Sequence, residues 1–302
     1  MIRTVQGDVA SIAGRILAHE HLQIDLCCQK GPEVVLGVAE RQAVVHDLGR
    51  AMQHGLKAIV DLSVCGSGRD ALGLKQISID AGLPVIGAAG FYWDPYPQVV
   101  FDSSVAALRD ILITEINSGI GDTTIRAGVI KVGTPRGDIG EPAARVFEAA
   151  AHAALATGAA VVTHTSAVEQ GAWHLAALTA AGLPPSRILI SHMGAARDVS
   201  QLTELARTGA FLGIDKVGFI ARRSNAELAD LVRDACRAGL ENQIILSSDV
   251  ARKDRLSKHG GSSYSAVFAD FIPMLQERGV SMEKIDTMLC VNPQRVLEIT
   301  QK

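Results

Sequence analysis

Short apolar runs alternate with longer amphipathic stretches along almost the whole chain, and this alternation constrains the fold more than any other feature. The runs are rich in Val, Ile and Leu, and continuous apolar strands of this kind indicate a parallel sheet covered by helices. Eight strands are predicted, at 15–24, 57–64, 84–92, 127–134, 159–166, 187–194, 210–218 and 243–250. Helical patterns lie between them, near 40–54, 69–81, 103–118, 142–157, 169–181, 198–208 and 224–238, with more helix after 263.

Eight strand–helix units without a linker or a change of composition predict an α/β protein with one domain, a single (β/α)8 TIM barrel over 1–302. The alternative is an open doubly wound sheet. The first predicted strand lacks the Gly-x-Gly-x-x-Gly turn of such sheets, and polar residues recur at the ends of many strands rather than at one switch point. We therefore expect a functional site at the C-terminal ends of the barrel strands.

The composition excludes several classes of protein. With 302 residues, 48% of them hydrophobic and 20% charged, the chain is neither disordered nor a disulfide miniprotein. A net charge of −3 without a basic stripe argues against a nucleic-acid partner, and no apolar run approaches the roughly 20 residues of a membrane span. Five cysteines without a Cys-x-x-Cys pair, and first residues without a signal-peptide pattern, favour a cytoplasmic protein with reduced thiols.

Two histidines lie two residues apart in the first predicted strand, within Leu17-Ala18-His19-Glu20-His21-Leu22. Side chains alternate along a strand, so His19 and His21 point to one face and can share a metal ion. Glu20 points the other way, which favours packing or support of the histidines over ligation. The motif alone is equally compatible with two polar residues at a strand end.

Lys131 lies in the apolar run 128–133 with no neighbouring acid. A buried ammonium without a partner costs several kcal/mol, so this lysine must lose its charge, find a carboxylate or be chemically modified. Three interpretations stay open: a Schiff-base lysine, a carbamate formed with CO2 that bridges two metal ions, and a lysine whose ammonium reaches solvent at the strand end.

Three further polar residues end later strands, namely His164, His192 and Asp249. Because parallel barrel strands end at one rim, four imidazoles, one lysine and one carboxylate are expected to meet there. The coincidence of six such groups predicts a metal site.

These motifs together resemble the phosphotriesterase-related family of the amidohydrolase superfamily over nearly the whole chain. The resemblance is carried by His19-Glu20-His21-Leu22, Ile130-Lys131-Val132-Gly133-Thr134, Thr163-His164-Thr165, Ser191-His192-Met193-Gly194, the segment 209–215, Leu246-Ser247-Ser248-Asp249 and Asn292-Pro293. It implies two divalent metal ions bridged by a carbamate on Lys131, and so favours the carbamate over the Schiff base. The implied ligands are His19, His21 and Asp249 for a buried ion and His164 and His192 for a more exposed one.

Such a site implies metal-assisted hydrolysis. Imidazole and carboxylate ligands suit Zn²⁺, and Mn²⁺, Co²⁺ or Fe²⁺ also fit the ligand types. A hydroxide bridging the ions would attack an ester-type carbonyl or a phosphoryl centre, and Asp249 would accept its proton.

Two positions depart from the efficient organophosphate hydrolases of the family, which carry a histidine after the strand-seven aspartate and an acid after the strand-six histidine. Here Lys216 follows Asp215, and 193–196 reads Met-Gly-Ala-Ala. Organophosphate triesterase activity is therefore expected to be weak and promiscuous. Lactonases of the family carry a cation where Lys216 stands and a tyrosine matched by Tyr92, which would either hydrogen-bond a substrate oxygen or serve as an aromatic wall.

Charge is distributed unevenly, since the loop 252–261 carries four cations and one anion in a chain of net charge −3. Loops after the last barrel strands are a recurrent phosphate site, so we expect an anionic small-molecule substrate such as a phosphorylated sugar lactone. The predicted contacts are Lys216, Arg252, Lys253, Arg255, Lys258 and Tyr264. The alternative is a basic loop that only faces solvent.

Two other functions stay open: a Schiff-base lyase that uses Lys131, and a barrel that binds a small molecule without turnover. The residues after the third strand are expected to be exposed and to form either a homodimer contact or a substrate wall. They are Phe91, Tyr92, Trp93, Pro95, Tyr96 and Pro97.

Overall fold

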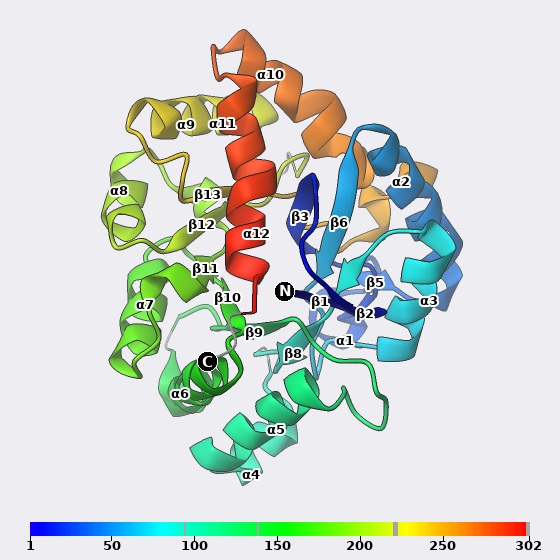
Figure 1. Cartoon of the computed structure of the whole chain (residues 1–302), viewed down its shortest axis with the longest axis vertical. Helices are drawn as coiled ribbons and strands as arrows, with labels where there is room; N and C mark the ends of the chain where they lie inside the picture. The colour runs from blue at the N-terminus through cyan, green and yellow to red at the C-terminus, as the bar shows by residue number, and fades with distance from the viewer. Residues whose placement is uncertain (94, 138, 220–222, 300–302) are drawn as a thin grey trace.

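Parallel strands form a barrel at the centre of the molecule, and helices surround it (Figure 1). The structure is a computed structural model that describes residues 1–93, 95–137, 139–219 and 223–299. The barrel strands are β3 (Arg15–Glu20), β6 (Leu56–Asp61), β7 (Val85–Ile86), β8 (Ala88–Gly90), β9 (Val129–Gly133), β10 (Ala160–His164), β11 (Ile188–Ile190), β12 (Phe211–Ile214) and β13 (Ile244–Leu246). The eight predicted strands are all present, each shorter than its predicted range.

The third predicted strand, 84–92, forms as two short segments with Gly87 between them. The first segment, β7, pairs with β6, whereas the second, β8, pairs with β9, so that this strand joins the two halves of the barrel. The last and first strands are joined by two backbone hydrogen bonds, from the Asp249 amide to the His19 carbonyl and from the His21 amide to the Val250 carbonyl, both 3.2 Å. The chain therefore forms the predicted TIM barrel.

Parallel pairing aligns the C-terminal ends of neighbouring strands. In the register of β9 and β10, Ala160 pairs with Val129 and His164 with Gly133. Almost all side chains of these two strands are buried, as expected for strands with the barrel interior on one face and helices on the other. Residues at the strand ends are thereby gathered at one rim.

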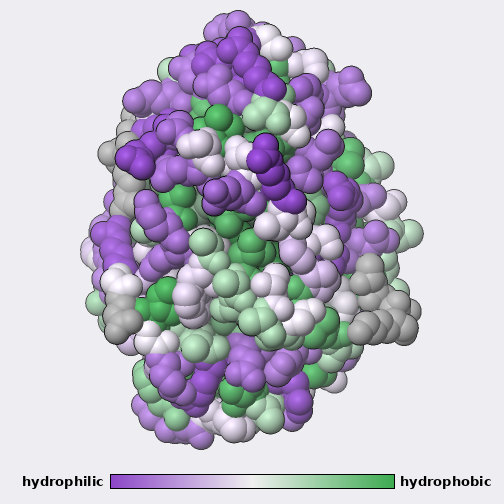
Figure 2. Space-filling view, turned by 90° about the vertical axis from the view of Figure 1, so that its left-hand side faces the viewer, coloured by the Kyte–Doolittle hydropathy of each residue, from purple (hydrophilic) through white to green (hydrophobic). Residues whose placement is uncertain are grey.

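Amphipathic helices cover the outside of the barrel and bury their apolar faces against it. They are α2 (Arg41–Gln53), α3 (Ala71–Ala81), α5 (Val105–Asn117), α6 (Gly140–Thr157), α7 (Gln170–Ala180), α8 (Ser200–Arg207), α9 (Asn225–Arg237), α10 (Ile272–Glu277), α11 (Met282–Asp286) and α12 (Asn292–Leu297). On the side of α7, α8 and α9, Figure 2 shows hydrophilic residues interspersed with hydrophobic ones. No helix within the described ranges is long and apolar enough to cross a membrane.

Several short elements lie outside the predicted pattern. The strands β1 (Ile2–Thr4) and β2 (Gly7–Val9) form an antiparallel hairpin. In the turn between them, the Val5 amide donates a hydrogen bond to the carbonyl of Val85 at the start of β7. The hairpin therefore lies at the end of the barrel opposite the polar rim. At the rim, β4 (Ile24–Asp25) pairs with β5 (Val35–Leu36) around the short helix α1 (Cys27–Lys30), and α4 (Gln98–Asp102) precedes α5. Three-residue strands and single helical turns are too short to show a clear hydrophobic period.

Candidate metal centre

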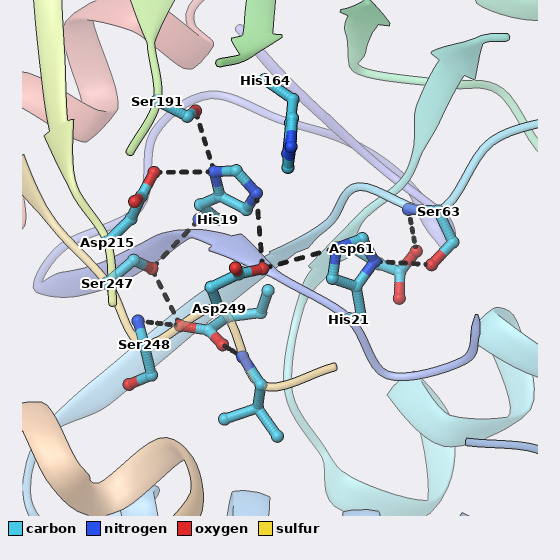
Figure 3. A network of polar contacts seen from close by, with 12 residues as sticks. His19, His21, Asp61, Ser63, His164, Ser191, Asp215, Ser247, Ser248 and Asp249 are labelled. Atoms are coloured by element: carbon cyan, nitrogen blue, oxygen red, sulfur yellow. Dashed lines mark hydrogen bonds and ion pairs between the residues drawn. The ribbon is translucent and has the colours of Figure 1, made fainter. Parts of the chain in front are cut away.

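The end of β3 brings two imidazoles to the rim. His19 is buried within the strand and His21 follows its last residue, with ring centroids 6.1 Å apart. Both Nε2 atoms lie 3.6 Å from the same oxygen, Oδ1 of Asp249 (Figure 3). These three side chains form one group that could hold a metal ion.

A second pair of imidazoles comes from the neighbouring strands on the other side of the rim. His164 ends β10, and His192 follows β11 in a left-handed backbone conformation with φ of 64°. Nδ1 of His164 lies 2.7 Å from Nε2 of His192, and the ring centroids are 4.3 Å apart. At this distance the two ring nitrogens share a hydrogen bond, and both are ligand atoms of the kind that Zn²⁺ takes.

Asp249 also has a left-handed backbone, with φ of 51°. The Glu20 carboxylate holds this turn from behind, because it accepts hydrogen bonds from the Ser248 and Val250 amides at 2.6 and 2.8 Å and from the Ser247 hydroxyl at 2.9 Å. Glu20 is fully buried, and it faces away from the histidines as the strand period predicts. It therefore braces the backbone on both sides of Asp249.

Asp215 is a site residue that sequence reasoning did not assign to the centre. It follows β12, and its carboxylate lies 2.9 Å from Nδ1 of His19 and 2.8 Å from Nδ1 of His192. The carboxylate also accepts from the His192 amide at 3.0 Å. Because the Asp215 carboxylate accepts hydrogen bonds from Nδ1–H of both rings, the Nε2 lone pairs of both rings are left on the side of Asp249, as metal ligation requires. Its position directly after the seventh strand was the available signal.

Lys131 lies on β9 and is 1% exposed. Its Nζ atom lies 3.3 Å from Nε2 of His19 and donates to the Thr163 carbonyl at 3.4 Å. Burial lowers the pKa of this ammonium to about 7. Near neutral pH much of the lysine is therefore the uncharged amine, the form that reacts with CO2 or with a carbonyl compound.

The electrostatics of the cluster suit a divalent cation. Burial lowers the pKa of His21 to about 3 and that of His192 to about 4, so these rings are neutral and offer lone pairs. Burial alone would raise the pKa of Asp249, but the charges that His192 and His19 carry when protonated, together with that of Lys216, outweigh burial and lower it to about 2. Neutral imidazoles beside an ionised carboxylate form the donor set that zinc and similar ions take, so the residues fit such an ion.

A cavity of about 640 Å³ opens above these groups. His19, His21, Lys131, His164 and Asp249 all line it, whereas His192 lines a small adjoining cavity with Asp215. Apolar walls with a few convergent polar groups are typical of small-molecule sites.

Of the six residues predicted to bind an anionic substrate, only Lys216 and Arg252 line the cavity. Lys253 lies 3.6 Å from Glu40 instead, and Lys258 is on an exposed turn. Arg255 is buried and donates to the Val217 carbonyl at 2.9 Å. Tyr264 is fully buried, with its hydroxyl donating to the His21 carbonyl at 2.9 Å. These four residues therefore do not line the cavity: Arg255 and Tyr264 satisfy backbone carbonyls, Lys253 faces Glu40 and Lys258 faces outward.

The segment after the third strand is buried, contrary to the expected exposure of Phe91, Tyr92, Trp93 and Tyr96. The Tyr96 hydroxyl donates to the Gly133 carbonyl at 2.8 Å. A Cβ on Gly133 would lie 2.5 Å from the Trp93 indole, so the missing side chain lets Trp93 pack closely against the strand. Tyr92 and Trp93 thereby form a wall of the cavity, and most of the expected dimer patch is not on the surface.

A parallel α/β barrel with histidines and aspartates at its C-terminal rim defines a class, the metal-dependent barrel enzymes. The family model for the phosphotriesterase family matches residues 1–297. The chain belongs to this family, whose members are metal-dependent hydrolases.

Individual relatives agree with this assignment. The phosphotriesterase homology protein of Escherichia coli is 30% identical, covering 94% of this chain and 98% of the relative. Its crystal structure, with phosphate in the active site, gives a TM-score of 0.91 at 29% identity and covers 94% of this chain and 99% of the other. The aryldialkylphosphatase of Saccharolobus solfataricus is 29% identical over 93% of this chain and 94% of its own. A Listeria monocytogenes lactonase shares the fold, with a TM-score of 0.92 at 24% identity and 99% of each chain covered.

Proposed function

We propose that this hydrolase is a lactonase with a binuclear metal centre that acts on an anionic or phosphorylated sugar lactone. The proposed ligands are His19, His21, Lys131 as its carbamate, His164, His192 and Asp249, with zinc as the metal. Two such ions would lower the pKa of a water molecule and polarise the substrate oxygen. The observation that carries the proposal is the position of Asp215, which holds His19 and His192 through Nδ1 and so leaves the Nε2 atoms of both rings on the side of Asp249.

Asp249 is the proposed proton acceptor. Its low pKa keeps it ionised at neutral pH, and its carboxylate lies where His19, His21 and Lys216 converge, with Lys216 Nζ 3.7 Å from Oδ2. A carboxylate so placed can take the proton of an attacking water and pass it to the leaving oxygen as the lactone ring opens.

The substrate would enter past the Tyr92–Trp93 wall. The two rings lie 4.6 Å apart, and the Trp93 ring lies 4.6 Å from that of His164. Tyr92 is proposed to contact the ring oxygen or the carbonyl of the lactone. Cations on the cavity lining, and the phosphate in the active site of the Escherichia coli relative, support an oxyanion in the substrate. Weak, promiscuous triesterase activity is part of the proposal.

The two alternatives are weakened by different observations. A Schiff-base lyase would also use the neutral amine of Lys131, but it gives no reason for four imidazoles beside that amine, and members of the family are hydrolases. The complete set of proposed metal ligands argues against a binding protein that has lost turnover.

A substrate screen tests the proposal. Lactones, carboxylic esters and phosphate triesters would be offered to enzyme reconstituted with zinc, manganese or cobalt, with the metal content measured by mass spectrometry. We expect lactones to be hydrolysed fastest, and Asp249→Asn to lose at least 100-fold in kcat with metal retained, the size of a general-base contribution.

Three results would contradict the proposal. One is equal turnover by Asp249→Asn with its metal retained, and another is faster hydrolysis of triesters than of lactones. The third is a borohydride-trapped adduct on Lys131 in place of the extra mass of a carbamate.

A further inference from the structure

The cavity lining carries more positive charge than the metal centre explains. Apart from Lys131 at its floor, the described lining includes four cationic side chains and, as its one carboxylate, Asp249. The cations are Lys30, Arg136, Lys216 and Arg252. Two of them, Lys30 and Arg136, come from the loops after the first and fourth barrel strands and lie outside the basic loop 252–261.

The charges of Lys216 and Arg252 are already partly balanced within the protein. Lys216 faces Asp249 at 3.7 Å, and Arg252 lies 3.1 Å from Asp254 and 3.6 Å from Glu33. Arg136 is exposed, and within the described ranges it forms no ion pair. An incoming anion would therefore gain more from Arg136 than from a guanidinium that must first leave two carboxylates.

The backbone holds Lys30 over the cavity. Its amide donates to the Leu26 carbonyl at 2.8 Å, and Leu26 in turn donates to Val34 at 2.9 Å beside the β4–β5 pair. From this turn the Lys30 ammonium lies 5.6 Å from the centre of the Tyr92 ring. The ring attracts the cation and so favours a position of the ammonium at the edge of the cavity.

Ring contacts connect Lys30 to the metal centre. Tyr92 packs on Trp93 and Trp93 on His164, with 4.6 Å between ring centroids in both cases. A substrate with its reacting carbonyl at His164 can therefore lie along the two aromatic rings and end at Lys30.

We propose that Lys30 and Arg136 form an anion-binding subsite for the end of the substrate remote from the reacting carbonyl. The ligand class is an ester or lactone that carries a carboxylate or phosphate beyond a short apolar or sugar stem. The stem lies on Tyr92 and Trp93, and the oxyanion accepts hydrogen bonds from the Lys30 ammonium and the Arg136 guanidinium. The inference rests on the proposed function for the identity of the reaction, but its binding step is independent of turnover.

Matched ligands with and without the remote anion test the subsite. Adipate carries two carboxylates and hexanoate one, on chains of equal length, so the ratio of their dissociation constants measures the second anion alone. Of the two tryptophans, Trp93 lines the cavity, so metal-loaded Trp173→Phe enzyme would report binding through Trp93 fluorescence. The 4-nitrophenyl esters of the same two acids give the corresponding KM values.

Lys30→Met is expected to weaken adipate binding about tenfold and to raise KM for the adipate ester by a similar factor, with kcat and the hexanoate values unchanged. Arg136→Gln is expected to weaken adipate binding several-fold and to raise KM for the adipate ester accordingly. Lys30→Arg is expected to keep most of the wild-type affinity for adipate. The matched control is Lys258→Met, at a lysine outside the cavity lining, which should change neither ligand.

The outcomes separate this inference from the proposed function. Adipate binding that depends on Lys30 in an enzyme that hydrolyses no ester or lactone supports the subsite and refutes the proposed reaction. If the enzyme hydrolyses lactones or esters but Lys30→Met loses affinity for adipate and hexanoate equally, the subsite is overturned and the proposed reaction stands. The same holds if Lys258→Met loses as much adipate affinity as Lys30→Met.

Discussion

Replacing Asp215 by asparagine is expected to weaken metal binding while the barrel stays folded. The carboxylate accepts hydrogen bonds from Nδ1–H of both His19 and His192, whereas an asparagine can accept from one ring and must turn its NH2 group toward the other. That second ring then carries its proton on Nε2, the nitrogen that faces the cavity. Loss of such a supporting contact costs about 10- to 100-fold in metal affinity. This range corresponds to about 1.4–2.8 kcal/mol.

Competition with a fluorescent zinc chelator measures this affinity without any substrate. The control is Asp47→Asn, which alters a carboxylate that is just as buried but accepts from the Ser257 amide and hydroxyl away from the histidines. We expect Asp47→Asn to lower the free energy of unfolding and to leave zinc affinity unchanged. Wild-type affinity in Asp215→Asn, or an equal loss in Asp47→Asn, would refute the assigned role of Asp215.

Three further predictions concern the framework of the site. In the metal-free protein the pKa of Lys131 is about 7 when folded and near its ordinary 10.5 when unfolded, so the unfolded chain binds more protons between these values. The free energy of unfolding should therefore rise with pH across that window, and Lys131→Met should remove this part of the rise in urea titrations. Glu20→Ala leaves the Ser248 and Val250 amides buried without an acceptor and should cost about 3 kcal/mol in the same assay, so a loss below about 1 kcal/mol would contradict the bracing role. Gly90→Ala would place a Cβ 2.0 Å from the Lys131 carbonyl oxygen and should prevent folding. The control is Gly82→Ala, where φ is 63° and nothing lies near the added Cβ, so the free energy of unfolding should fall by only about 1–2 kcal/mol. Equal stability of the two variants would argue against the close contact at Gly90.

The strands and the polar residues at their ends were predictable because both follow from local pattern. A strand such as 129–133 is apolar along its whole length, and a residue such as His164 at its end has one rim to face in a parallel barrel. The break at Gly87 was not predictable, since it depends on which neighbour each half of the strand pairs with.

Residues on the rim loops were the least predictable. Arg255 and Lys258 were both expected at the substrate because they share a basic loop, yet one is buried against a carbonyl and the other faces outward. Lys30 gave no signal in the sequence, because its place over Tyr92 depends on the β4–β5 pair rather than on any local period. The direction of a loop side chain is a tertiary property, and charge counts along the chain do not contain it.

The two hydrogen bonds that close the barrel join Asp249 to His19 and His21 to Val250, so the seam between the first and last strands runs through three of the candidate ligands. An ion held by those side chains would also fasten the two ends of the barrel together. Metal binding would then stabilise the closure of the barrel, and chelation should loosen this seam before any other part of the sheet. Amide hydrogen exchange at His21 and Asp249 would register that opening while the interior of β10 stayed protected.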